Sequence, residues 1–328
     1  MPKYAVMQNP GHNRVYFNSS GKLAKNELSA LFPGNISDID EELFGGIEYI
    51  TFEKQSGLSE SDLILLSRLS FVYAVFEICG KLFTPVRKNH SYFFSDDLNM
   101  ILKYSGKTNE LFTRMMLNLA VCASKFDFRD NLNLLDPVCG KGTAVFDGLI
   151  CGYNSYGIDI SDKLINESAQ FFKKYLETGK YKHSYKKEKI AKAQGHFFEV
   201  AKNKADQKNN IDLSCGFIGG DSVNAGRYYK KNFFNIIVGD LPYGVQHDNS
   251  AFGNKMRNPT DLIGACLPVW LEVLKPGGGI AISWNTFLLK RAELEKIFEA
   301  NKLEVLDFGD FTHRVDQAIM RDLIVARK

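Results

Sequence analysis

The sequence lacks any Cys-x-x-Cys pair, and none of its six cysteines lies at a spacing from histidine that suits zinc. A disulfide framework or a structural metal site is therefore not expected, and we predict that the chain holds no metal. The thiols are expected to be reduced and mostly buried. They lie at positions 79, 122, 139, 151, 215 and 266.

Long hydrophobic runs are also missing. The most apolar stretch, residues 67–83, is interrupted by Arg68, Glu77 and Lys81, whereas a membrane-spanning helix needs about 20 mainly apolar residues. The opening residues MPKYAVMQNP lack the charged start and apolar stretch of a secretory signal. We therefore expect a cytoplasmic protein with no membrane segment, and its 328 residues are enough for one large or two ordinary domains.

The chain as a whole has no strong excess of either charge, because its formal net charge is only +3. Residues 173–208 are the exception, with eleven lysines against four acidic residues. Aromatic residues are interleaved with these lysines, namely Tyr175, Tyr181, Tyr185, Phe197 and Phe198. This mixture suits phosphate contact and base stacking, so the basic insert 173–208 is a candidate contact for nucleic acid. The alternative is a solvated helix and loop with no partner.

Residues 3–79 show the pattern β-α-β-β-α-β. Strands are predicted at 4–8, near 35–40, and in IEYITFEK and VYAVFEIC, with helices in GKLAKNELSALF and ESDLILLSRLS. This order predicts a small α+β ferredoxin-like domain over residues 1–80. Residues 81–106 have weak periodicity and are predicted to be a linker with one or two short strands.

From residue 107 to residue 328, predicted helices and strands alternate, which indicates an α/β fold with a mainly parallel sheet covered by helices on both faces. The chain then closes with LEVLDF and RDLIVARK, two predicted strands with no helix between them. A terminal hairpin of this kind places one antiparallel strand in a parallel sheet. It distinguishes methyltransferase-type Rossmann-like folds from dehydrogenases, so we predict a mostly parallel seven-stranded sheet with a C-terminal antiparallel hairpin.

The stretch NLLDPVCGKGTAVFDG, residues 133–148, joins a predicted strand to a glycine turn. It is not a phosphate-binding P-loop, because Lys141 lies between Gly140 and Gly142 rather than before a serine or threonine. Val145 stands where a dinucleotide fingerprint has its third glycine, so NAD is not expected either.

Acidic residues follow three of the predicted strands. Asp136 precedes the glycine turn, Asp159 lies 23 residues later where it can hold both ribose hydroxyls, and Asp221 can accept a hydrogen bond from an adenine amino group. Any one of them alone is more often a helix cap or a solvated loop residue. Together with the glycine turn they fit a cofactor that has a nucleoside but no phosphates, which points to S-adenosylmethionine.

The tetrapeptide Asp240-Leu241-Pro242-Tyr243 follows the next predicted strand, in IIVGDLPYGVQ. It matches the [D/N]-x-P-[Y/F] motif of enzymes that methylate nitrogen attached to a planar system. The lone pair of such a nitrogen is delocalised, and the Asp240 carboxylate and a main-chain carbonyl fixed by Pro242 can accept its two hydrogens. Tyr243 can stack on the base. In isolation, Pro-Tyr-Gly would be read as a surface turn.

The segments LLDPVCGKGT, GIDIS, GDLPYG and LKPGGGIAI resemble those of the THUMP-associated tRNA guanine-N2 methyltransferases, which are class I S-adenosylmethionine-dependent RNA methyltransferases. The resemblance covers the C-terminal two-thirds of the chain, and the N-terminal β-α-β-β-α-β order also resembles the ferredoxin-like domain that opens those proteins. It implies that Asp240, Leu241, Pro242 and Tyr243 face the target amine. It implies a cofactor site lined by Asp136, Cys139, Gly140, Gly142, Thr143, Asp159, Ile160, Asp221 and Ser222.

One departure from this family bears on the substrate. Only about 27 residues separate the two predicted domains, too few for a complete THUMP domain, which in relatives docks the tRNA acceptor end. The resemblance implies RNA, and tRNA in particular, as partner. Two alternatives stay open, namely an amino methyltransferase that acts on DNA bases or a protein glutamine amide, and a non-catalytic cofactor-binding protein of the same fold.

Overall fold

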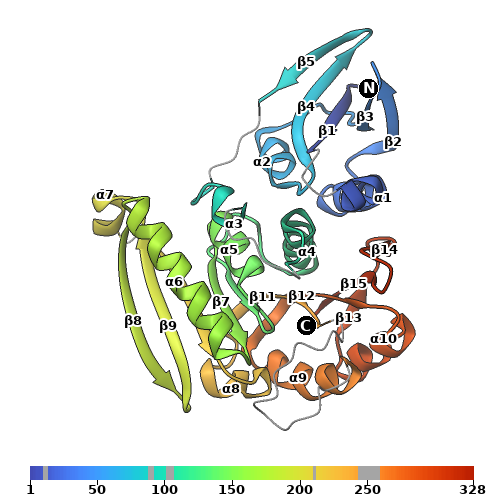
Figure 1. The fold of residues 1–328 in the computed structure, drawn as a ribbon. Coiled ribbons are helices and arrows are strands. Elements are labelled where there is room, and N and C mark those ends of the chain that lie inside the picture. Colours follow the sequence, from blue (N-terminus) through green and yellow to red (C-terminus); the bar gives the residue numbers. More distant parts are fainter. Residues whose placement is uncertain (10–13, 88–91, 101–106, 210–211, 243–258) are drawn as a thin grey trace. The chain divides into compact units, whose positions relative to one another are not determined.

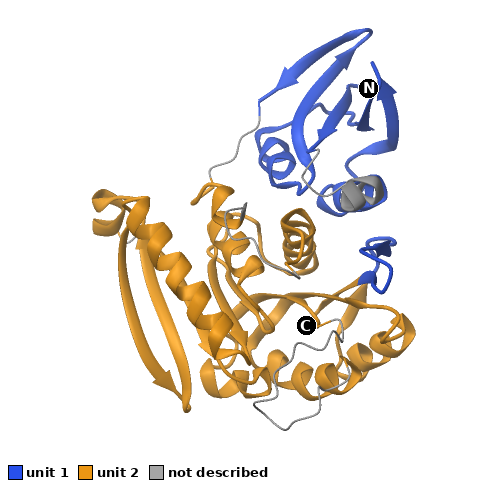
Figure 2. Ribbon diagram, in the orientation of Figure 1, with its two compact units in different colours: residues 1–91, 307–322 blue, residues 92–306, 323–328 orange. Residues whose placement is uncertain are grey.

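The computed structural model describes residues 1–9, 14–87, 92–100, 107–209, 212–242 and 259–328 (Figure 1). The chain divides into two compact units, coloured separately in Figure 2. Unit 1 consists of residues 1–91 and 307–322, and unit 2 of residues 92–306 and 323–328. The predicted division into domains 1–80 and 107–328 with a linker 81–106 stays a prediction, and residues 307–322 of the second predicted domain cluster with unit 1.

Unit 1 contains a five-stranded antiparallel sheet in the order β2-β3-β1-β4-β5. Its first six elements have the predicted β-α-β-β-α-β order, and assignment to the ferredoxin-like class stays a prediction. The fifth strand lies in the predicted linker, where one or two short strands were expected, and it pairs with β4 along its whole length. The elements are β1 (Lys3–Gln8), α1 (Arg14–Leu31), β2 (Ser37–Phe44), β3 (Ile47–Glu53), α2 (Glu60–Arg68), β4 (Val72–Cys79) and β5 (Leu82–Val86).

The second segment of unit 1, residues 307–322, is joined to helix α1 by side-chain hydrogen bonds. Lys22 Nζ lies 2.7 Å from Asp310 Oδ2 and 2.8 Å from the carbonyl oxygen of Thr312. Asn26 Nδ2 donates to the carbonyl oxygen of Asp310 at 2.8 Å. These bonds, between residues more than 280 positions apart, explain why this segment belongs to unit 1 and why no local sequence pattern predicts it.

Unit 2 is an α/β structure with a large mixed sheet. The strand order is β13-β15-β12-β11-β6-β7-β10-β9-β8, and β14 pairs with the first residues of β15. Strands β10, β7, β6, β11 and β12 are parallel neighbours, whereas β13 is antiparallel to β15, and β9 is antiparallel both to β10 and to β8.

The helices and strands of this part begin with α3 (Asp97–Met100), α4 (Glu110–Ala123), β6 (Asn133–Asp136), α5 (Thr143–Ile150), β7 (Asn154–Asp159), α6 (Asp162–Thr178), β8 (Lys182–Ile190), β9 (Ala193–Ala201), α7 (Lys204–Lys208) and β10 (Leu213–Gly219). They continue with η1 (Ser222–Asn224), α8 (Ala225–Tyr228), β11 (Phe234–Asp240), α9 (Pro259–Val273), β12 (Leu274–Asn285), α10 (Arg291–Ala300), β13 (Glu304–Leu306) and β15 (Met320–Arg327). The short strand β14 (His313–Arg314) and the first three residues of β15 belong to unit 1.

The sheet is larger than the seven strands predicted, because the lysine-rich insert folds as a hairpin of two nine-residue strands. Strand β8 lies at the edge of the sheet and is mostly exposed. An exposed edge strand needs no apolar side, so the alternation that identifies a strand in a sequence is missing from KHSYKKEKI.

Two buried clusters hold the sheet of unit 2 between helices. Phe217 and Ile218 are neighbours on β10 but belong to different clusters, because successive side chains of a strand point to opposite faces. The cluster of Ile218 includes Trp270 on α9, and the cluster of Phe217 includes Phe172 on α6. No helix in the described part of the chain is both long and apolar enough to cross a membrane.

Candidate functional site

The acidic residues singled out in the sequence meet at one edge of the sheet of unit 2. Strands β10, β7, β6 and β11 are parallel neighbours, so their carboxyl ends lie side by side. Asp136, Asp159 and Asp240 are the last residues of three of these strands, and Asp221 lies two residues after the fourth. The structure therefore brings these four predicted residues to a common edge.

The glycine turn requires glycine at two positions. Gly140 and Gly142 have φ angles of +51° and +86°, in the left-handed region that glycine adopts without strain. A Cβ atom on Gly142 would lie 2.9 Å from the ring of Phe217. The turn is also bonded to the neighbouring strand, since the backbone N–H of Cys139 donates to the carbonyl oxygen of Ile158 at 2.9 Å.

Asp159 connects the glycine turn to strand β7. The backbone N–H of Gly140 donates to its Oδ2 and that of Ser161 to its Oδ1, both at 2.8 Å. Burial raises the pKa of this carboxyl, and the two backbone hydrogen bonds oppose that rise. A carboxylate has about four acceptor positions, so two backbone donors leave it able to accept further hydrogen bonds from a ligand.

Asp136 is the most deeply placed acid of this group. Burial raises its pKa well above the usual value, the hydrogen bond from the backbone N–H of Val138 opposes the rise, and the charges of Asp159 and Asp240 add to it. Two charged carboxylates nearby favour the neutral form of a third. Asp136 therefore keeps its proton to a higher pH than an exposed aspartate does.

Asp240 is held by two hydroxyl groups that sequence reasoning missed. Thr108 Oγ1 donates to its Oδ2 at 2.6 Å, and Ser283 Oγ donates to its Oδ1 at 2.5 Å. Ser283 lies opposite Asp240 in the register of β11 and β12, a signal that exists only once the pairing is known. Thr108 lies 132 residues from Asp240 and has no such signal. One hydroxyl on each oxygen fixes the plane of the carboxylate.

The rest of the tetrapeptide is described only in part. The backbone N–H of Leu241 donates to the carbonyl oxygen of Ser283 at 2.9 Å, and the Leu241 side chain is buried. Pro242 is exposed. Tyr243 lies outside the described residues, so its predicted place beside a base stays a prediction.

The other predicted cofactor residues differ in their surroundings. Thr143 is buried in the first turn of α5, whereas the Ile160 side chain is 78% exposed directly after Asp159. Asp221 accepts a hydrogen bond from the backbone N–H of Val223 at 3.1 Å and so caps η1. The Ser222 side chain is buried. Asp221 is thus a helix cap, as acids after a strand often are, and its predicted contact with adenine stays a prediction.

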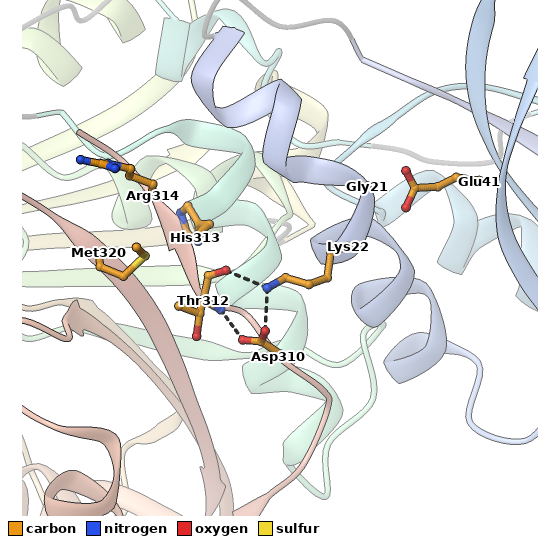
Figure 3. A pocket seen from close by; sticks show the side chains of 8 residues that line it. All are labelled: Gly21, Lys22, Glu41, Asp310, Thr312, His313, Arg314 and Met320. Atoms are coloured by element: carbon orange, nitrogen blue, oxygen red, sulfur yellow. Dashed lines mark hydrogen bonds and ion pairs between the residues drawn. The ribbon is translucent and has the colours of Figure 1, made fainter. Parts of the chain in front are cut away.

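A cavity of about 580 Å³ lies in unit 1 (Figure 3). Burial raises the pKa of Asp310 there, but hydrogen bonds from Lys22 and Thr312 outweigh it and bring the pKa to about 2. The Asp310 carboxylate is therefore ionised at neutral pH and balances the charge of Lys22. None of the predicted site residues is in the lining, which consists of Gly21, Lys22, Glu41, Asp310, Thr312, His313, Arg314 and Met320.

Among the described residues, no group of three or more histidine, cysteine or acidic side chains is placed to hold a metal ion.

No family model matches the sequence, and no curated protein matches it. Solved structures resemble it at low identity. An rRNA methylase from Streptococcus thermophilus is 12% identical with a TM-score of 0.36, over 66% of this chain and 95% of that one. A TehB-like SAM-dependent methyltransferase from Corynebacterium glutamicum is 14% identical (TM-score 0.36, 67% and 97% covered). A Streptococcus mutans protein solved in complex with SAH is 13% identical (TM-score 0.37, 64% and 94% covered).

The raised pKa of Asp136 predicts a pH-dependent stability. The folded-state pKa lies above the usual 3.8, so stability from the protonated carboxyl is complete below about pH 4 and is lost as the pH rises through the folded pKa. Asp136→Asn cannot lose that proton. Urea unfolding of both proteins between about pH 4 and pH 8 should show a free-energy gap that grows in favour of the variant. A free-energy gap that does not change with pH would contradict this account.

Proposed function

We propose that this chain is an S-adenosylmethionine-dependent methyltransferase that methylates an exocyclic amino group of an RNA base, with guanine N2 in tRNA as the substrate. One observation carries the proposal. The carboxylate of Asp240, held by Thr108 and Ser283, ends the strand next to the one that leads into the glycine turn, which is bonded to Asp159. A methyl donor bound at the glycine turn and an amine bound to Asp240 would then lie side by side at the carboxyl edge of the parallel strands.

The cofactor part of the proposal rests on the turn and the acids beside it. Two left-handed glycines allow close approach of the main chain to a ligand. Asp159 offers charged acceptors for ribose hydroxyls, and the exposed Ile160 offers an apolar surface beside it. When bound, S-adenosylmethionine supplies a methyl group on a positively charged sulfur. Cys139, Gly140, Gly142, Thr143, Asp136, Asp221 and Ser222 complete the proposed lining.

The catalytic part assigns the amine to Asp240. Its carboxylate and a main-chain carbonyl beside Pro242 accept the two amino hydrogens, which turns the nitrogen lone pair toward the methyl carbon. The bound cofactor would donate its methyl group to the nitrogen and leave as S-adenosylhomocysteine, and the proton released by the nitrogen would pass to the Asp240 carboxylate that accepts its hydrogen bond. Positive charge grows on the nitrogen during this step. A carboxylate fixed in advance by Thr108 and Ser283 stabilises that charge without reorganising.

The RNA part rests on the basic insert 173–208, whose central part forms the hairpin β8–β9. Lysines 182, 186, 187 and 189 are exposed along the edge strand β8. Tyr185 between them is exposed, and Lys173 Nζ lies 5.3 Å from the centre of its ring. Lysines with an aromatic ring between them suit a nucleic-acid backbone and its bases. Lys186 is paired with Glu188 at 2.5 Å, so part of its charge is already balanced.

Cofactor binding can be tested by thermal and chemical unfolding. S-adenosylhomocysteine at a hundredfold excess over its Kd should stabilise the protein by about 2.7 kcal/mol, whereas NAD and ATP should not. Asp159→Asn should weaken S-adenosylhomocysteine binding by about 1–3 kcal/mol, because a charged acceptor is lost. The exposed Asp130→Asn is the matched control. Stabilisation by NAD and none by S-adenosylhomocysteine would refute the assignment of the glycine turn.

Catalysis can be tested by radiolabelled methyl transfer to tRNA without modifications, followed by nucleoside analysis. Asp240→Ala should lower kcat by two to three decades, about 3–4 kcal/mol, because its contact strengthens in the transition state. Thr108→Val should lower kcat in the same direction, and Thr108→Ser should restore it. Both variants of Thr108 and Asp240→Ala should bind S-adenosylhomocysteine as the wild type does. Methyl transfer by Asp240→Ala at the wild-type rate would disprove the mechanism, and label found only in DNA or protein would move the substrate to those classes.

The role of the hairpin can be tested through the salt dependence of RNA binding. Replacing Lys186, Lys187 and Lys189 with Gln should lower the slope of log K against log salt by about two to three units, since each lost phosphate contact removes about 0.7 to 0.9. S-adenosylhomocysteine affinity should not change. The exposed lysines of a control variant, Lys296→Gln with Lys302→Gln, should leave the slope unchanged. An equal slope in the triple variant and the wild type would show that the hairpin is a solvated edge that does not bind RNA.

A further inference from the structure

Residues 286–290, which we call the Phe287 turn, connect β12 to α10 (Figure 1). Two neighbouring apolar side chains in it face solvent, with Phe287 59% and Leu288 41% exposed. The exposed Lys290 follows at the end of the turn. An aromatic ring, an aliphatic side chain and a cation are therefore presented together over five residues.

The turn is fixed at both sides of the exposed pair. Trp284 and Leu289 are buried, and the indole Nε1–H of Trp284 donates to the carbonyl oxygen of Leu289 at 2.8 Å. The backbone N–H of Phe287 donates to Asn285 Oδ1 at 3.2 Å, and that of Leu288 to the carbonyl oxygen of Asn285 at 3.0 Å. A ring held in place by its backbone loses little conformational freedom when it binds a partner.

The position of the turn relates it to Asp240. Ser283, three residues before Thr286, pairs with Asp240 in the register of β11 and β12, and its hydroxyl donates to the Asp240 carboxylate. Ser283 also accepts the backbone N–H of Leu241. The Phe287 turn therefore begins where β12 leaves the side of the proposed catalytic residue, at the carboxyl edge of the parallel strands.

Single exposed apolar residues are normal on protein surfaces. In unit 2 the large exposed hydrophobic side chains among the described residues are Ile160, Tyr185, Phe287 and Leu288. Three of these four follow the carboxyl ends of strands, two after β12 and one after β7. Three of the four large exposed hydrophobic side chains therefore follow strands at the sheet edge that carries the acids, and Phe287 and Leu288 are adjacent there.

We propose that the Phe287 turn is a nucleotide-binding site for the RNA substrate, in which Phe287 stacks on a base and Lys290 contacts a phosphate beside it. Aromatic stacking is tolerant of base identity, and an adjacent cation supplies the backbone contact. Naming RNA as the ligand rests on the proposed function, whereas the exposed ring, its rigid support and its place beside Asp240 do not.

Affinity measurements on the full chain test the proposal. Phe287→Ala should raise the Kd for an unmodified tRNA transcript, and its KM in methyl transfer, by about 5- to 150-fold, the loss that removal of one stacked base gives. Phe287→Trp should stay within a few-fold of wild type, and Lys290→Gln should lower the salt slope by about one unit. Tyr73→Ala, at a 57% exposed aromatic on β4 of unit 1, is the control. Each variant is first shown to bind S-adenosylhomocysteine with the wild-type Kd.

Photo-cross-linking separates this proposal from the proposed function. Phe287→p-benzoylphenylalanine should cross-link to the tRNA transcript or to a short single-stranded RNA, and the same replacement at Tyr73 should not. If the wild type transfers no methyl group but position 287 cross-links, the binding site stands and the enzymatic assignment fails. Methylation by the wild type together with an unchanged KM in Phe287→Ala, or the absence of a cross-link at position 287, would overturn the site.

Discussion

The hydrogen bond from the backbone N–H of Gly140 to the carboxylate of Asp159 determines the form of the whole site. It closes the glycine turn onto the end of β7, and the left-handed conformation of Gly140 turns the chain that follows this N–H. The glycine turn also positions the start of α5, because Gly142 is the N-cap residue that directly precedes the helix. A side chain at Gly142 would meet Phe217, so the closure also depends on the core of the sheet.

The electrostatics of the edge follow from gathering acids where parallel strands end. The carboxyls of Asp136, Asp159 and Asp240 are close enough for the charges of the last two to raise the pKa of the first. The protein balances this with donors, namely backbone N–H groups for Asp159 and hydroxyl groups for Asp240. A ligand that carries positive charge would relieve the same repulsion, and the sulfonium of the proposed cofactor is such a ligand.

Sequence reasoning located the acids because parallel strands bring their carboxyl ends to one edge, so that strand ends alone were enough to group Asp136, Asp159 and Asp240. It could not locate Ser283, whose contact depends on strand register, or Thr108, which lies in the segment just before α4 and far from Asp240 in the sequence. The strands of the basic insert were missed because β8 is an exposed edge strand and lacks alternating apolar residues. The roles of the site residues stay predictions, and Tyr243 lies outside the described residues.

The discontinuity of unit 1 has a consequence for synthesis of the protein. Lys22 and Asn26 on α1 are bonded to Asp310, which is made almost 290 residues later. A ribosome produces chains from the N-terminus, and domains generally fold as they emerge. The strands of the five-stranded sheet can therefore pair early. The side chains of Lys22 and Asn26 lack their partner Asp310 until nearly all of unit 2 has been translated. Of the two units, unit 1 is therefore expected to begin folding first, yet it is completed only after residues 307–322 have been made.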